Sequence, residues 1–325
     1  MTSVTWLRLG WLGLLAATLT ATAQEKNPAI TDPAKADADF AVLGDYVGEL
    51  RDEAGQPQKY GVQVVALGSG KFRAVAWRGG LPGDGWDKSK KIEAPGETKE
   101  GGVGFPKLLG SATLKQGVLT VTSGSGAKLG ELKRIVRQSS TLGAKPPEGA
   151  SILFDGSTAD KFTGGKMTDD KLLQAGGRSK QMFKDFTLHV EFRCPYQCKL
   201  NGNSGVYLQN IYEIQIIDSF GKDQGKGSCG AIYGIRAPDV NVSFPPLSWQ
   251  TFDVQFQAAR FADDGTVQKN PVVTVRHNGV VIHENAELPP KGTDGGKLAA
   301  QGGPLYLQYY GGSPVHFRNI WVAEK

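Results

Sequence analysis

The segment Phe186-Thr-Leu-His-Val-Glu-Phe-Arg193 alternates strictly between apolar and polar side chains. Successive side chains of a β-strand point to opposite sides. One face of this segment is therefore apolar and suited to a core, and the other carries Thr187, His189, Glu191 and Arg193. The period of a helix, 3.6 residues, would not sort the side chains in this way. The segment predicts a half-buried strand.

Further short segments of the same kind follow towards the C-terminus. Asn278-Gly279 favours a type I′ turn, in which both central residues adopt positive φ, and so predicts a hairpin. Strands are predicted at residues 206–217 (two strands around Asn210), 251–257, 272–277, 280–284, 305–309 and 315–322. Many short strands with Gly and Pro turns between them indicate a sandwich or jelly roll. We therefore predict an all-β fold for residues 151–325.

The preceding part of the chain shows a similar pattern on a smaller scale. Residues 60–67 and 71–77 predict a hairpin around Gly68-Ser69-Gly70, and Gln116-Gly117 predicts a second hairpin. Residues 79–106, rich in Gly, Lys, Glu and Pro, predict a long loop. No apolar pattern of helical length is present, so no helix longer than about three turns is expected after the leader. Residues 24–137 are predicted to form a small β-rich module.

Residues 138–150 differ in composition from the segments on either side. They contain Pro146-Pro147 and few large apolar side chains, which is typical of a linker. We expect the module and the domain at residues 151–325 to fold separately, with this linker open to proteases.

Residues 1–23 have the features of a secretory signal peptide. Arg8 supplies a positive charge, residues 9–19 are mostly apolar, and Ala21-Thr22-Ala23 fits the small-residue cleavage rule. The apolar run is too short to cross about 30 Å of hydrocarbon. We expect an exported, periplasmic or secreted protein that begins at Gln24 and has no membrane span after cleavage.

The charge distribution argues against nucleic acid as a partner. The chain carries 37 Lys and Arg against 32 Asp and Glu, and no element concentrates the basic residues. A protein that binds nucleic acid normally gathers its basic residues along one face or one helix.

The chain contains three cysteines, and an exported protein meets conditions in which disulfides persist. Cys194 and Cys198 could close a small loop, or Cys229 could pair with either of them, and the spacing does not decide between these pairings. Zinc would need a fourth ligand, which no nearby His or Cys pair supplies at the usual spacing. A structural bridge or buried thiols are expected rather than a catalytic thiol.

The stretch Tyr212-Glu-Ile-Gln-Ile-Ile-Asp218 is the strongest candidate for chemistry. In a strand, Glu213 and Gln215 point one way and the isoleucines beside them point the other way. Asp218 ends the strand and points away from Glu213 unless a bulge turns it back. Two carboxylates near one sheet face are the usual catalytic groups for general acid–base catalysis on a sugar. The simpler alternative is a polar face that is only solvated.

Residues 152–323 resemble the 3-keto-disaccharide hydrolase family in several short segments that occur in the same order. The resembling segments are Ile152-Leu-Phe-Asp-Gly156, Asp185-Phe-Thr-Leu-His-Val-Glu-Phe-Arg193, Asn203-Ser-Gly-Val206, Tyr212-Glu-Ile-Gln-Ile-Ile-Asp218, Gly230-Ala-Ile-Tyr233 and Val315-His-Phe-Arg-Asn-Ile320. The resemblance covers slightly more than half of the chain.

The resemblance implies a concanavalin-like jelly roll with a concave sheet that binds a carbohydrate, namely a glycoside already oxidised at C3. It implies Glu213 as a base or a metal-facing carboxylate, with Asp218 as the second catalytic candidate. The implied substrate contacts are Asn203, Ser204, Gln215, Glu191, Tyr233 and Tyr310. A divalent metal could polarise the ketone, but no His-rich constellation demands one, so the question of a cofactor stays open.

Structural roles compete for several of these residues. Glu191 could pair with Arg193 or Arg318. Asn203 and Ser204 could belong to a turn that is held by side-chain to backbone bonds. Tyr233 could fill the sandwich instead of stacking on a sugar ring.

Two departures from the family pattern bear on activity. Tyr310 stands where the family commonly has a His, and Phe162 stands where it has a Trp. A Tyr donates a hydrogen bond but does not accept a proton near neutral pH. The alternative to a hydrolase is therefore a non-catalytic, lectin-like protein that uses the same sheet to bind carbohydrate.

Overall fold

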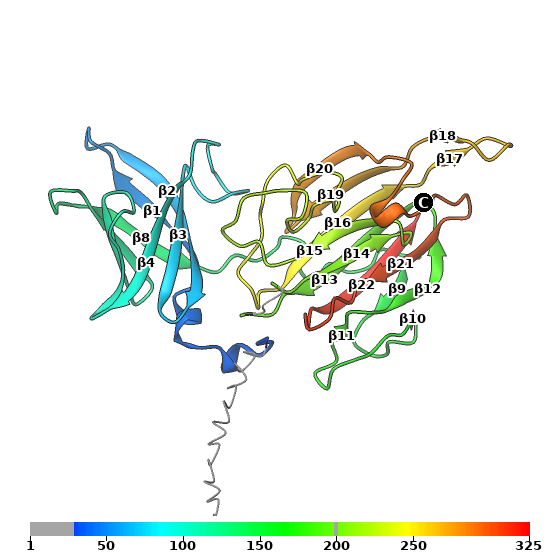
Figure 1. Cartoon of the computed structure of the whole chain (residues 1–325), viewed down its shortest axis with the longest axis horizontal. Coiled ribbons are helices and arrows are strands. Elements are labelled where there is room, and N and C mark those ends of the chain that lie inside the picture. The colour runs from blue at the N-terminus through cyan, green and yellow to red at the C-terminus, as the bar shows by residue number, and fades with distance from the viewer. Residues whose placement is uncertain (1–28, 198–200) are drawn as a thin grey trace, which may run out of the picture.

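A computed structural model describes residues 29–197 and 201–325, and nearly all regular structure in this part of the chain is β-strand. The predicted all-β sandwich preceded by a β-rich module is confirmed (Figure 1). The helices of the described residues are three 3₁₀ turns, η1 (Pro33–Lys35), η2 (Ala38–Ala41) and η3 (Thr293–Gly295). The predicted absence of long helices is therefore confirmed for these residues.

The N-terminal module is a closed antiparallel barrel of eight strands. Its strands are β1 (Gly44–Arg51), β2 (Pro57–Gly68), β3 (Lys71–Arg78), β4 (Ile92–Lys99), β5 (Gly102–Phe105), β6 (Ser111–Lys115), β7 (Val118–Thr122) and β8 (Lys128–Ile135). Strand β1 pairs with both β2 and β8, which closes the barrel. Alternate side chains, such as Val62, Val64 and Phe72, fill its interior.

The predicted long loop at residues 79–106 is wrong, because it contains β4 and β5. Strand β4 carries Pro95 and Gly96, which normally argue against a strand. A side-chain carbon on Gly96 would lie 2.3 Å from the ring of Phe105. The glycine therefore makes room for an aromatic side chain of the neighbouring strand inside the barrel, so it marks a close approach rather than a turn.

The C-terminal domain is a sandwich of two sheets. The first contains β10 (Phe162–Thr163), β12 (Arg178–Phe183), β21 (Gly303–Leu307), β14 (Ser204–Leu208) and β15 (Tyr212–Ile216), in that order. The second contains β11 (Leu173–Gln174), β22 (His316–Glu324), β13 (Phe186–Arg193), β16 (Gln250–Gln257), β19 (Val272–His277) and β20 (Val280–Glu287), and β9 (Ser151–Phe154) joins it beside β22. A separate small ribbon pairs β17 (Arg260–Phe261) with β18 (Val267–Lys269).

Aromatic side chains fill the space between the two sheets. The ring centroids of Tyr212, from the first sheet, and Phe256, from the second, are 6.4 Å apart. Phe192 and Phe252 lie at 4.7 Å, and both are fully buried. Burial of one such side chain contributes about 2–3 kcal/mol, so this core holds the two sheets together. Asn278 and Gly279 have φ of 53° and 83°, as the predicted hairpin requires.

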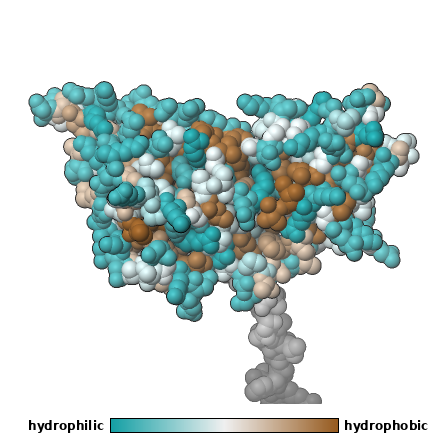
Figure 2. Space-filling view, turned by 180° about the vertical axis from the view of Figure 1, so that it is seen from behind, coloured by the Kyte–Doolittle hydropathy of each residue, from teal (hydrophilic) through white to brown (hydrophobic). Residues whose placement is uncertain are grey.

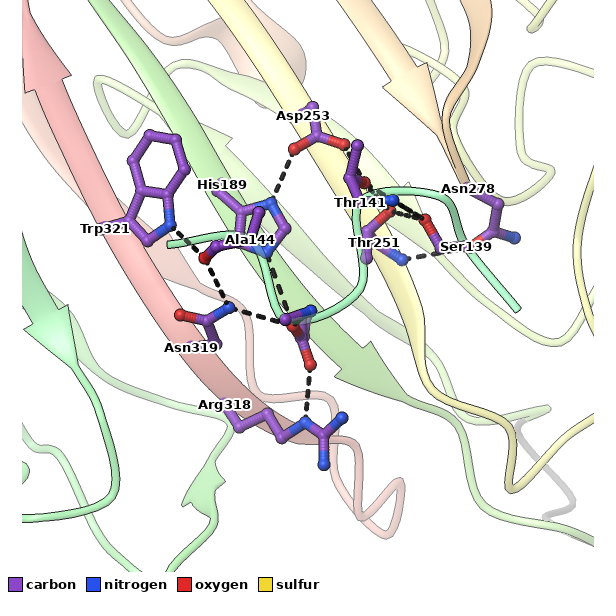
Figure 3. Close-up of polar contacts among 12 residues, drawn as sticks. Ser139, Thr141, Ala144, His189, Thr251, Asp253, Asn278, Arg318, Asn319 and Trp321 are labelled. Atoms are coloured by element: carbon purple, nitrogen blue, oxygen red, sulfur yellow. Dashed lines mark hydrogen bonds and ion pairs between the residues drawn. The ribbon is translucent and has the colours of Figure 1, made fainter. Parts of the chain in front are cut away.

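Residues 138–150 do not run freely between the two units. Ser139 donates to or accepts from Thr251 at 2.6 Å, and the Gly143 amide donates to Glu191 at 2.6 Å. The Ala144 carbonyl accepts from the Trp321 indole at 3.1 Å (Figure 3). The polar outer face of the second sheet supplies these partners, so the first half of the segment is a docked strap rather than the exposed linker that its composition predicts.

Most of the molecule's rear face is hydrophilic, and apolar residues lie there in small groups (Figure 2). Across residues 29–197 and 201–325, no helix has the length and apolar character needed to cross a bilayer. The predicted signal peptide, residues 1–23, lies outside the described residues.

Candidate functional site

Strand β15 separates apolar from polar side chains as its sequence predicts. Ile214 and Ile216 point into the core of the sandwich. Glu213 and Gln215 occupy the opposite face of the strand and are only 2% and 3% exposed. The first sheet therefore holds a carboxylate and an amide on its outer face, under a cover of loops.

A glycine on the neighbouring strand makes room for the carboxylate. Gly205 of β14 pairs in register with Gln215, and Glu213 pairs with Tyr207. A side-chain carbon on Gly205 would lie 2.2 Å from Oε1 of Glu213. The Asn203-Ser-Gly-Val segment thus contributes an open space, and any larger residue at Gly205 would displace the carboxylate.

Two side chains from neighbouring strands orient Glu213. The Tyr207 hydroxyl donates to Oε2 of Glu213 at 2.9 Å. The Gln308 amide, just after β21, donates in turn to the Tyr207 oxygen at 3.3 Å. A hydrogen bond to a charged acceptor is stronger than one between neutral groups, and the chain of bonds holds the carboxylate in one orientation.

The same face holds acceptors that have no partner within the described residues. The Oε1 atoms of Gln215 and Gln308 are buried and make no hydrogen bond there. An unsatisfied buried acceptor costs free energy. A ligand that carries hydroxyl groups, such as a sugar, would satisfy both amides, and this is the kind of polar convergence that binding sites show.

The loop between β15 and β16 forms one wall of the site. The Tyr233 amide donates to the Glu213 carbonyl at 2.9 Å, and the Gln215 amide donates to the Ala231 carbonyl at 2.9 Å. This backbone pairing brings Tyr233 beside Glu213, and the Tyr233 side chain is 41% exposed. The loop therefore places a residue with an accessible aromatic side chain opposite Glu213 along the edge of β15.

Tyr306 of β21 lies beside Tyr207, and Tyr310 follows in the turn after β21. Tyr306 contacts Tyr207, with ring centroids 5.5 Å apart, and the guanidinium of Arg178 lies 4.5 Å from the Tyr306 centroid. Tyr310, two residues after Gln308, is 48% exposed. Exposed tyrosines beside polar groups suit a sugar, which offers both apolar ring faces and hydroxyls.

Two other predicted contacts have different positions. Ser204 is fully buried on the core side of β14, where its hydroxyl donates to the Gln308 carbonyl at 2.7 Å. It therefore connects two segments and is not placed to contact a substrate. Asn203 is half-buried at the start of β14, and its amide donates to the Ser313 hydroxyl at 3.2 Å. The alternation of β14 puts it on the same face as Gly205.

Asp218 does not lie beside Glu213. It lines a cavity of about 480 Å³ between the barrel and the sandwich, together with Val65 and Tyr196. Its carboxylate accepts from the Phe220 amide at 3.1 Å, and burial raises its pKa. The structure therefore does not assemble the pair of carboxylates that the sequence suggested.

Glu191 belongs to the other sheet. Its carboxylate accepts from Arg318 at 2.6 Å, from Asn319 at 3.0 Å and from the Gly143 amide at 2.6 Å. Burial acts to raise the pKa of Glu191, but these donors and His189 outweigh it and lower the pKa to about 2. Glu191 therefore pairs with Arg318, one of the structural roles considered for it, and its bond to Gly143 anchors the strap.

Cys229 is not placed as a reactive thiol. Cys229 is buried and free, and burial raises its pKa to about 12. It is therefore not the disulfide partner of Cys194. Cys198 lies outside the described residues, so the pairing of Cys194 with Cys198 stays a prediction.

Among the described side chains, those around Glu213 do not form a metal-binding set. Its neighbours Tyr207, Gln215 and Gln308 offer a phenol and two amides, not the further carboxylates or imidazoles that hold most protein-bound metals. Among the side chains that the structure describes, no three of His, Cys, Asp or Glu gather closely enough to hold a metal ion.

The comparisons with known proteins agree with this geometry. Residues 149–323 match the family model described as a 3-keto-alpha-glucoside-1,2-lyase-like domain. A crystal structure of a protein from Parabacteroides distasonis ATCC 8503, provisionally named a glycosyl hydrolase, is 29% identical, with a TM-score of 0.50 over 55% of this chain and 85% of that one. The fold and the site thus define a carbohydrate-active β-sandwich protein. Because the match spans more than half of the chain, the protein belongs to the 3-keto-alpha-glucoside-1,2-lyase-like family.

Two further structures from the same organism, also provisionally named glycosyl hydrolases, are similar at 21% and 18% identity. Their TM-scores are 0.41 and 0.39, each covers 55% of this chain, and the matches span 100% and 94% of their own chains. No curated protein matches the chain. The matched region begins at residue 149, after the last barrel strand has ended at Ile135, so it covers the sandwich and leaves out the barrel.

Proposed function

We propose that the sandwich cleaves glycosides that carry a ketone at C3, by elimination followed by addition of water. The observation that carries the proposal is the Glu213 carboxylate, which Tyr207 orients on a sheet face that also holds two buried amide oxygens without a partner among the described residues. The family match supports the choice of a 3-keto substrate. Export of the protein is part of the proposal and rests on residues 1–23.

The chemistry needs one well-placed base. The C3 ketone acidifies the proton at C2, and Glu213 takes this proton. The electron pair of the C2–H bond forms a C1=C2 double bond, and the C1–O bond breaks, so the leaving oxygen takes a proton from solvent and departs as the alcohol. Water then adds to C1 of the enone and a proton returns to C2. The net change is hydrolysis of the glycosidic bond, and a positioned base contributes about 10²–10⁴-fold to such a step.

The other residues of the face bind and orient the sugar in this proposal. Gln215 and Gln308 accept hydrogen bonds from sugar hydroxyls. Tyr233 and Tyr310 stack against the ring or donate from their hydroxyls. The proton transfer at C2 rests on Glu213, the carboxylate of this face.

Cleavage of a matched pair of substrates tests the proposal. The full chain is incubated with a chromogenic glucoside and with the same glucoside oxidised at C3. We expect release of the aglycone from the oxidised compound only, and slower release when C2 carries deuterium, because the C2–H bond breaks. Equal cleavage of both compounds would contradict the keto-dependent mechanism. Binding of the oxidised sugar without release would favour the lectin-like alternative.

A further inference from the structure

The loop that walls the candidate site also contacts the barrel, which the family match does not include. Residues 217–249, between β15 and β16, contain no strand and lie between the barrel and the two sheets (Figure 1). An irregular loop depends on its contacts for a fixed shape. The residues of the barrel that touch this loop therefore bear on the geometry of the site.

The barrel holds the first turn of the loop closely. The Arg73 guanidinium of β3 donates to the Gly221 carbonyl at 2.8 Å and pairs with Glu93 at 3.0 Å. Lys91, just before β4, pairs with Asp223 at 2.5 Å. A side-chain carbon on Gly221 would lie 2.5 Å from Val65, so this backbone, whose φ is 65°, rests directly on the barrel.

The last part of the loop is held by the barrel as well. A side-chain carbon on Gly83, in the turn after β3, would lie 2.7 Å from Val242. The Arg137 guanidinium, which pairs with the buried Asp45 of β1 at 2.8 Å, lies 4.9 Å from the Phe244 ring centroid. Both ends of the loop thus rest on barrel residues.

Hydrogen bonds connect these contacts with the candidate site. Asn241 donates to the carbonyls of Ser219 and Lys222, which ties the two ends of the loop together. The Cys229 amide donates to the Ser219 hydroxyl at 2.9 Å. The next residue, Gly230, donates to the Gln215 carbonyl at 2.8 Å. Hydrogen bonds within the loop therefore connect the barrel contact at Gly221 with β15, the strand that carries Glu213.

We infer that the barrel is a positioning element of the candidate site, in which Arg73 holds the loop that presents Tyr233 beside Glu213. The inference rests on the proposed function for its kinetic consequence, but its structural consequence is independent of catalysis. Arg73 touches no substrate in this account and acts only through the loop. The barrel is accordingly an integral part of the site rather than a separate binding module.

The test uses the full chain with Arg73→Met, Arg73→Lys and the matched control Arg78→Met. Arg78 lies on the same strand, and within the described part of the chain its side chain bonds only to Gln58 and Asp87 of the barrel unit. Hydrogen exchange of the peptide at residues 219–236 is measured for each variant. Loss of one charge-assisted bond predicts about tenfold faster exchange in Arg73→Met, partial recovery in Arg73→Lys and no change in Arg78→Met.

Kinetics with the 3-keto-glucoside provide the second readout. We expect KM to rise about tenfold in Arg73→Met with kcat within about twofold of wild type, because loop order affects binding more than chemistry. Asp223→Asn, which leaves the barrel sequence intact, should also make hydrogen exchange of residues 219–236 faster. Wild-type exchange and wild-type KM in Arg73→Met would overturn the inference. If the wild-type chain shows no turnover, only the proposed function is contradicted. The hydrogen-exchange data still test whether Arg73 holds the loop in place.

Discussion

Gly205 and Glu213 lie on adjacent strands, and a single added carbon on Gly205 would come within 2.2 Å of the Glu213 carboxylate. The space beside a candidate base is therefore created by the absence of a side chain. The φ of Gly205 does not fall in the left-handed region, so the glycine is needed for room and not for backbone conformation.

This relationship predicts that Gly205→Ala abolishes most activity while the fold persists. The new methyl group forces Glu213 out of position, and a misplaced catalytic group costs about 10²-fold in kcat. Overpacking should lower the free energy of unfolding by about 1–3 kcal/mol. Kinetics and urea unfolding measure both effects. Gly124→Ala is the matched control, since a carbon there meets nothing within 4 Å. Full activity in Gly205→Ala would show that the position of Glu213 is unimportant.

Tyr207→Phe tests the bond that orients the carboxylate. Removing the hydroxyl deletes a hydrogen bond to a charged acceptor, which is worth about 1.5–3 kcal/mol. We expect kcat/KM to fall about ten- to a hundredfold. Tyr60→Phe, in the barrel, controls for loss of a tyrosine hydroxyl elsewhere. A fall of the same size in both variants would mean that Tyr207 has no specific role.

The contacts of Glu191 with the strap predict how the stability of the fold depends on pH. The pKa of Glu191 is lowered to about 2 in the folded chain, from an ordinary value of 4.5. A carboxyl with a lowered pKa stabilises the fold above its unfolded pKa, and the contribution disappears as the pH falls towards the folded pKa. Glu191→Gln should therefore lower the free energy of unfolding by about 3 kcal/mol at neutral pH.

The difference between wild type and Glu191→Gln should shrink as the pH falls from about 4.5 towards 2. Urea unfolding at a series of pH values measures it. Glu284→Gln, which alters an exposed carboxylate of β20, should show no such dependence. A difference between wild type and Glu191→Gln that stays constant down to pH 2 would contradict the assignment of Glu191 as the charged anchor of the strap.

Sequence alternation predicts the faces of individual strands but not their neighbours. The alternation correctly assigns Glu213 and Gln215 to one face of β15. Tyr207 and Gln308, which complete the site, come from other strands, and only the register of the sheet brings them together. The alternation of β14 puts Tyr207 on one face, but no local pattern shows that this face is shared with Glu213.

The sequence leaves the role of Glu191 open and predicts residues 79–106 wrongly, for different physical reasons. Both sheets of the sandwich carry polar side chains on their outer faces, and local alternation does not distinguish one sheet from the other, so Glu191 looks equivalent to Glu213 in sequence. Strand β4 has only Ala94 and Gly96 facing the barrel interior, because Phe105 fills the space from the next strand. Its pattern therefore resembles a loop.

The central claim is that Glu213 removes the C2 proton, and Glu213→Gln tests it most directly. Gln keeps the size and the hydrogen bonds of the side chain but cannot accept the proton. Release of the aglycone from a 3-keto-glucoside is compared in wild type, Glu213→Gln and Glu284→Gln. The melting temperature of each variant is measured as a control for folding. The account predicts a loss of about 10²–10⁴-fold in kcat for Glu213→Gln with sugar binding retained, and none for Glu284→Gln. Unchanged turnover in Glu213→Gln would contradict it.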